Sequence, residues 1–180
     1  MITIFFAHGF EEIEGLAVLD ILRRAELDVR SVGVGGREIT GSHGITVTCD
    51  MTALDADTKD LEMVVLPGGM PGTLNLEKSQ IVTTFIQYAV EQNLWLAAIC
   101  AAPSILGHMG LLAGKRVTCF PGFETQLGED AIFTGSFVER DSKLVTARGA
   151  GVAVDFGLEL VECLLGSERA GALRASLQCR

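Results

Sequence analysis

The sequence has few basic residues and no long hydrophobic run. Lys and Arg number 14 against 23 Asp and Glu, which gives a formal net charge of −9. Nucleic acids and anionic membrane surfaces require a basic face, so we expect neither as a partner. The longest apolar run covers residues 94–103, about half of what a bilayer crossing requires. No basic segment precedes the apolar start of the chain, as a signal peptide would need, and we therefore expect a cytoplasmic protein.

The sequence also lacks several motifs that would bind a cofactor or a metal. It has no Cys-X-X-Cys pair, no GxGxxG after its first strand and no GxxxxGK[ST], and its three histidines do not have the spacing of a metal site. The cysteines are odd in number and scattered, which argues against a disulfide framework. They are Cys49, Cys100, Cys119, Cys163 and Cys179. We expect no cofactor and no metal, and at most one reactive thiol.

The composition is that of a folded chain. Hydrophobic residues make up 48% of the 180 residues and the mean hydropathy is +0.38, outside the range of disordered chains. At roughly 150 residues per domain, the length predicts a single domain over residues 1–180. A C-terminal helix and tail are expected from about residue 167.

Short apolar runs alternate along the chain with segments of helical periodicity. The runs that predict strands cover residues 2–7, 29–34, 45–49, 63–66, 94–99, 117–119, 137–139 and 144–146. The segments that predict helices cover residues 11–25, 79–92, 103–109 and 152–165. This alternation predicts an α/β fold with a mostly parallel sheet and helices on both faces. In such folds the working site lies at the carboxyl ends of the strands.

Cys100 lies at an abrupt junction between a predicted strand and a predicted helix. Ala98 and Ala102 flank it at two residues on either side, as the sharp turn of a nucleophile elbow requires. Free N–H groups at the start of the helix would favour a thiolate and lower the thiol pKa. The local pattern is equally compatible with a buried core cysteine.

A cluster of acids follows the first predicted strand. Glu11, Glu12 and Glu14 could all be solvated residues of a first helical turn. If Glu14 instead faces Cys100, its carboxyl could stay protonated and act as a general acid or base. His8, at the end of the same strand, fits a capping or packing role better than a catalytic one.

Gly68 and Gly69 follow the strand at residues 63–66 without a bulky side chain. Their N–H groups, together with that of Ala101, could form an oxyanion site beside Cys100. An ordinary turn is the alternative.

Four stretches together resemble one protein family over nearly the whole chain. They are GFEEIE at 9–14, VVLPGG at 64–69, AAICAAP at 97–103 and TARGAG at 146–151. In this order they resemble the DJ-1/ThiJ/PfpI superfamily, in the branch of DJ-1 and its bacterial YajL-like relatives. The resemblance implies a flavodoxin-like three-layer sandwich that usually forms a homodimer.

The resemblance also implies roles for individual residues. Cys100 corresponds to the family's reactive, oxidation-sensitive cysteine, Glu14 to its protonated acid, and Gly69 with Ala101 to its oxyanion site. Two departures matter. Phe120 stands where some relatives carry a histidine, so Glu14 would have to move protons without it. Ala101 stands where the protease branch has a histidine, which argues against peptidase activity.

Two functions follow from the resemblance. The first is a glyoxalase or deglycase that acts on methylglyoxal or on early glycation adducts, with Cys100 as nucleophile and Glu14 as general acid and base. The alternative is an oxidative-stress sensor or redox-regulated chaperone that works through a Cys100 sulfinate. The expected partner is accordingly a small carbonyl compound or a peroxide.

Overall fold

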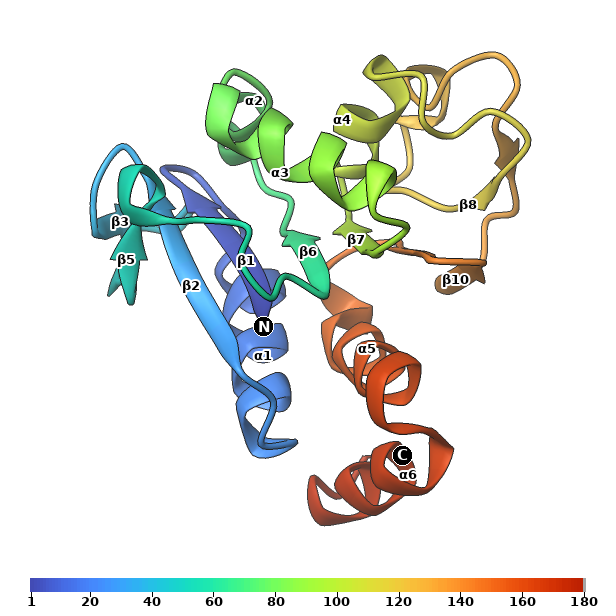
Figure 1. Cartoon of the computed structure of the whole chain (residues 1–180). Coiled ribbons are helices and arrows are strands. Elements are labelled where there is room, and N and C mark those ends of the chain that lie inside the picture. The colour runs from blue at the N-terminus through green and yellow to red at the C-terminus, as the bar shows by residue number, and fades with distance from the viewer. Residues whose placement is uncertain (180) are drawn as a thin grey trace.

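Seven strands form the central sheet of the computed structural model, which describes residues 1–179 (Figure 1). They are β1 (Ile2–Ala7), β2 (Val29–Val34), β5 (Met51–Thr52), β6 (Met63–Leu66), β7 (Trp95–Ile99), β10 (Val138–Asp141) and β11 (Leu144–Ala147). Their order across the sheet is β10-β11-β7-β6-β1-β2-β5. All neighbours pair in parallel except β10 with β11. The predicted mostly parallel sheet is confirmed, while residue 180 of the predicted domain lies outside the described residues.

Helices cover both faces of this sheet. Figure 1 shows α1 (Glu12–Arg24), α5 (Ala153–Leu165) and α6 (Ser167–Ser176) on one side. The other side carries α2 (Gly72–Glu77), α3 (Gln80–Glu91) and α4 (Pro103–His108). Strand β1 is buried on both faces, since Ile4 and Phe6 belong to one hydrophobic core and Phe5 to the other. This arrangement confirms the three-layer sandwich, and α6 confirms the expected C-terminal helix.

Two predicted strands lie outside the central sheet. The run at residues 45–49 contains β4 (Thr46–Thr48), which pairs with β3 (Glu38–Thr40) in a separate antiparallel hairpin. The run at 117–119 overlaps β8 (Arg116–Val117), which pairs with β9 (Ile132–Phe133). The first run placed its strand to within one residue, whereas the second shares only Val117 with β8. Neither predicted the partner strand, because pairing depends on residues distant in the sequence. Three short 3-10 turns complete the fold, at Ala53–Asp55, Glu124–Gln126 and Ala150–Val152.

The sheet order decides where chemistry can take place. Strands β1, β6 and β7 are neighbours and run in parallel, so their carboxyl ends meet at one edge of the sheet. The acidic segment after β1, the Gly68-Gly69 turn and Cys100 each follow one of these strands. Among the described residues, no helix is both long and apolar enough to cross a lipid bilayer.

Candidate functional site

Cys100 occupies a sharp turn between β7 and α4. Its φ of +66° lies in the left-handed region, which is disfavoured for a residue with a side chain. Two backbone hydrogen bonds hold the turn: the Cys100 N–H donates to the Ala147 carbonyl, and the Cys100 carbonyl accepts from the Phe120 N–H, both at 2.8 Å. Ala98 and Ala102 are completely buried on either side. The structure thus has the geometry of a nucleophile elbow, and the thiol is partly accessible.

Glu14 reaches this elbow from α1. Its side chain is only 1% exposed, and its Oε2 accepts a hydrogen bond from the Gly68 N–H at 2.9 Å. Among residues 1–179, its buried Oε1 has no hydrogen-bond partner of good geometry. Burial raises the pKa of Glu14 to about 7, against the opposing influence of the nearby Cys100 thiol and the Gly68 N–H. Solvation of this acid, the alternative left open by the sequence, is therefore excluded.

The Cys100 thiol and the Glu14 carboxyl oppose each other's ionisation. Burial raises the pKa of Cys100 to about 12, and the Glu14 carboxylate and its hydrogen bond add to this effect. The N–H groups of Gly69 and Ala101 act in the opposite direction. The prediction that helix N–H groups leave Cys100 with a low pKa is therefore wrong when Glu14 is ionised. Protonation of Glu14 removes its negative charge, so Cys100 ionises more readily beside a neutral Glu14 than beside a carboxylate.

The two glycines after β6 have different surroundings. The Gly68 N–H binds Glu14 and is not free to bind an oxyanion, which corrects the prediction for this residue. A Cβ at Gly68 would lie 2.6 Å from the Cys100 Cβ and 2.7 Å from Glu14 Oε2, so only glycine fits between them. The N–H groups of Gly69 and Ala101, in contrast, both face the Cys100 sulfur. Gly68 positions Glu14, and the oxyanion role stays a prediction for Gly69 and Ala101.

Glu12 was not singled out by its position in the sequence, but it is nearly as inaccessible to solvent as Glu14. It is 4% exposed and accepts hydrogen bonds from the His43 N–H at 2.7 Å and from the Ile45 N–H at 3.3 Å. Its other oxygen lies 3.0 Å from the His43 Nδ1. Burial alone would raise the pKa of Glu12, but these contacts outweigh it and lower the pKa to about 2. Glu12 thereby anchors the β3–β4 hairpin beside the site.

Three side chains in this region could together offer ligands to a metal ion. Ligand atoms of Glu11, Glu12 and His43 lie within 4.8 Å of one another. The carboxylate of Glu12 is already bound by His43 and by backbone N–H groups, so hydrogen bonding accounts for the cluster. His8 lies apart from it and accepts the Thr40 N–H through Nδ1 at 3.1 Å, in agreement with the expected capping role.

A groove of about 330 Å³ borders the site, lined by Phe120, Phe137, Arg148 and residues 149–152 among others. A Cβ at Gly149 would meet the Phe120 ring at 3.1 Å and Glu14 Oε1 at 3.9 Å, so the groove wall adjoins the catalytic candidates. Phe120 and Phe137 are exposed. A small molecule that reaches Cys100 along this groove would pass two aromatic rings and one guanidinium group.

Comparison with known proteins identifies the family. The sequence profile of the DJ-1/PfpI family matches residues 1–163. The chain belongs to this family. The DJ-1 homolog B of Arabidopsis thaliana is 36% identical over 97% of the chain, which spans 40% of that longer relative. A Caenorhabditis elegans member named glutathione-independent glyoxalase DJR-1.2 is 29% identical, with 91% of the chain and 87% of the relative covered.

The fold agrees equally well with solved structures of the DJ-1/PfpI family. The structure of oxidized Toxoplasma gondii DJ-1 superposes with a TM-score of 0.95 at 30% sequence identity, and the match covers 99% of this chain and 97% of that one. Fold and family are thus shown by both sequence and structure.

Proposed function

We propose that this protein is a cysteine-dependent glyoxalase or deglycase, with Cys100 as nucleophile and Glu14 as general acid and base. The observation that carries the proposal is a carboxyl with a pKa of about 7 buried against the thiol. General acid and base catalysis is most efficient when the pKa of the group lies near the working pH. The worm relative named as a glyoxalase supports the same reading.

In the proposed reaction, the Cys100 sulfur attacks the aldehyde carbon of methylglyoxal. A carbon–sulfur bond forms, and the carbonyl oxygen takes up the proton held by Glu14 to give a hemithioacetal. The N–H groups of Gly69 and Ala101 would stabilise charge on that oxygen. Glu14 then removes the proton from the first carbon and returns it to the second, while the hydroxyl proton moves from the first oxygen to the second, which leaves a thioester. Water cleaves the thioester, and lactate and the free thiol are released.

The proposal is tested by measuring lactate formed from methylglyoxal by the purified full chain. We expect Cys100→Ser to abolish lactate formation. The matched control is Cys163→Ser, because Cys163 is also partly buried but lies in α5. Equal activity in Cys100→Ser and in the wild type would refute the proposal. Release of sugar from an early glycation adduct, measured on the same variants, tests the deglycase reaction.

A second function is favoured by the groups around the sulfur. The N–H groups of Gly69 and Ala101 and the Glu14 carboxyl would also hold the oxygens of a sulfinate, and the Toxoplasma relative was solved in an oxidized form. We therefore propose stress sensing or redox-regulated chaperone activity as the alternative. Mild peroxide should add two oxygen atoms to Cys100 before Cys163 or Cys179, as measured by peptide mass spectrometry. Indiscriminate oxidation of the three thiols would contradict it.

We also propose that the protein forms a homodimer and is located in the cytoplasm. Ile13 on α1 and Ile45 in the β3–β4 hairpin are exposed at 57% and 53%. Glu12 joins their two segments, since it neighbours Ile13 and accepts the Ile45 N–H. An apolar surface of this kind favours association. Light scattering on the purified chain tests the dimer, and Ile13→Asp should shift it to monomer.

A further inference from the structure

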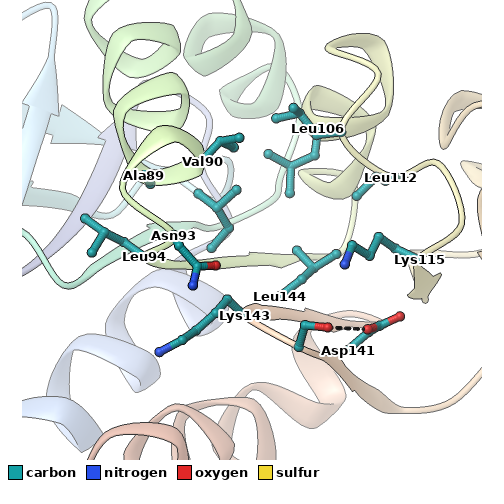
Figure 2. Close-up of a pocket in the computed structure, with 13 residues that line it drawn as sticks. Ala89, Val90, Asn93, Leu94, Leu106, Leu112, Lys115, Asp141, Lys143 and Leu144 are labelled. Carbon is teal, nitrogen blue, oxygen red and sulfur yellow. Dashed lines mark hydrogen bonds between the residues drawn. The ribbon is translucent and has the colours of Figure 1, made fainter.

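A second pocket lies at the opposite edge of the sheet from Cys100. It has a volume of about 170 Å³ and is enclosed by the end of α3, the loop after α4 and the β10–β11 turn (Figure 2). Leu96, on its floor, precedes Cys100 by four residues along β7. At roughly 3.3 Å per residue, the two sites are about 13 Å apart. The pocket is therefore separate from the catalytic candidates.

The interior of this pocket is almost entirely leucine. Six leucine side chains line it: Leu94, Leu96, Leu106, Leu111, Leu112 and Leu144. Leu96, Leu106, Leu112 and Leu144 are buried, so the floor belongs to the hydrophobic core on that face. An enclosed cavity of about 150 Å³ lined by leucine, isoleucine and phenylalanine is known to hold benzene. A volume of about 170 Å³ thus accommodates an apolar group of about six carbon atoms.

The rim of the pocket is cationic although the protein as a whole is acidic. Lys115 and Lys143 lie on the rim beside one acid, Asp141. Asp141 accepts the Arg116 N–H and the Ser142 hydroxyl, both at 2.9 Å, and the nearby charge of Lys115 helps to lower its pKa. The rim therefore carries two cations against one anion. The ion pairs among residues 1–179 include neither lysine. The Lys143 ammonium lies 4.6 Å from the centre of the Trp95 ring.

Lys115 is the cation placed to meet a ligand. In Figure 2 its side chain extends toward Leu144, across the pocket from the Asn93 amide. An ammonium group beside an apolar floor attracts an anion more strongly than one in open solvent, because the local dielectric constant is lower.

We propose that this pocket binds a small monocarboxylate with a compact apolar tail. The tail occupies the leucine-lined floor, and the carboxylate accepts a hydrogen bond from the Lys115 ammonium at the rim. For a ligand of about ten heavy atoms we expect a Kd of about 0.1–1 mM. Binding here is independent of whether Cys100 acts as a catalyst.

The experiment is an NMR titration of the isotope-labelled full chain with phenylacetate, which has this size and charge. We expect saturable shifts at the amides of Asn93, Lys115 and Lys143, and none at Cys100. Phenylacetamide, which has the same shape but no charge, should bind about tenfold more weakly, as expected for a lost charge-assisted hydrogen bond. Shifts that do not saturate, or equal binding of the two compounds, would overturn the proposal.

Variants locate the binding group. Lys115→Met keeps most of the side-chain length but removes the charge, and it should weaken phenylacetate binding about tenfold without changing that of phenylacetamide. Lys115→Arg should restore most of the affinity. Lys59→Met, at an exposed lysine outside the pocket, is the matched control. Because Lys115 lies on the rim, we expect its replacement to leave the fold intact, and the spread of amide signals verifies this in each variant. Unchanged affinity of Lys115→Met for phenylacetate would refute the assignment.

Discussion

Glu12 and Glu14 lie two residues apart in the first turn of α1 and are buried to nearly the same degree, yet their acidities differ widely. Glu12 receives two backbone N–H groups and His43 from the β3–β4 hairpin, and its pKa falls to about 2. Glu14 receives one N–H and faces a thiol, and its pKa rises to about 7. Both carboxyls are shielded from solvent, but Glu12 lies just beneath the exposed His43 whereas Glu14 lies deeper in the protein, so depth and hydrogen bonding together decide the charge state. They thereby decide whether the carboxyl anchors a hairpin or holds a proton.

The largest expected effect comes from removing the proton of Glu14. We expect Glu14→Gln to reduce lactate formation from methylglyoxal by about 10²–10⁴-fold, the usual contribution of a general acid or base. The amide keeps the shape of the side chain and still accepts the Gly68 N–H. Steady-state kinetics measures this effect, with Cys163→Ser as the active control. A decrease of less than about tenfold would mean that another group moves the proton.

The raised pKa of Glu14 also predicts how stability depends on pH. The folded-state pKa of about 7 lies above the ordinary value of 4.5, so the folded protein binds the proton more tightly than the unfolded chain. The contribution of Glu14 to the free energy of unfolding is therefore fully present below pH 4.5 and is lost as the pH rises through 7. The loss is about 3 kcal/mol at 1.36 kcal/mol per pKa unit. Urea denaturation from pH 5 to pH 8 measures it, and Glu14→Gln should abolish this dependence.

Glu12 should show the opposite behaviour. We expect Glu12→Ala to lower the free energy of unfolding by about 1–3 kcal/mol, since hairpin N–H groups lose their acceptor. Glu12→Gln retains an acceptor oxygen and should be affected less. The folded-state pKa of about 2 lies below 4.5, so the stabilisation by the charged group is present above pH 4.5 and lost as the pH falls toward 2. Similar stability of the alanine variant and the wild type at pH 7 would contradict an anchoring role.

The smallest effect is expected at Glu11, the third acid of the cluster. Its negative charge raises the pKa of Glu14. Glu11→Gln should therefore lower the pKa of Glu14 and shift the acidic side of the pH profile of kcat/KM to lower pH, with little change in the maximum rate. A shift to higher pH would contradict this interaction.

Much of the fold could be predicted from local sequence. The buried runs at β1, β2, β6 and β7 and the helices α1 and α3 were expected close to their observed bounds, because hydrophobic periodicity is a local property. The partner of β4 and the existence of α2 were not, since both depend on contacts outside their own segments. The elbow at Cys100 was likewise predictable from small flanking residues, and the structure confirms its geometry.

The electrostatics of the site could not be predicted in this way. The sequence suggested N–H donors that lower the pKa of Cys100, whereas burial and Glu14 raise it. It also grouped Gly68 with Gly69 as oxyanion donors, although the Gly68 N–H is bound to Glu14. Both errors arise because Glu14 is 54 residues from Gly68 in the chain and farther still from Cys100, so that these groups meet only in the folded protein.

By itself, the sequence predicted a small α/β domain, and its scarcity of basic residues, nucleotide-binding motifs and long hydrophobic runs predicted that it has no polyanionic partner. The order of its motifs predicted the family, which the comparisons confirm, and Cys100 as the reactive cysteine, which stays a prediction. Only the tertiary structure decided which of three neighbouring acids holds a proton, and only it revealed a leucine-lined pocket with a cationic rim at the far edge of the sheet. The physical reason is that pKa values and cavities depend on surroundings assembled from distant segments, whereas secondary structure and motifs are set by neighbours along the chain.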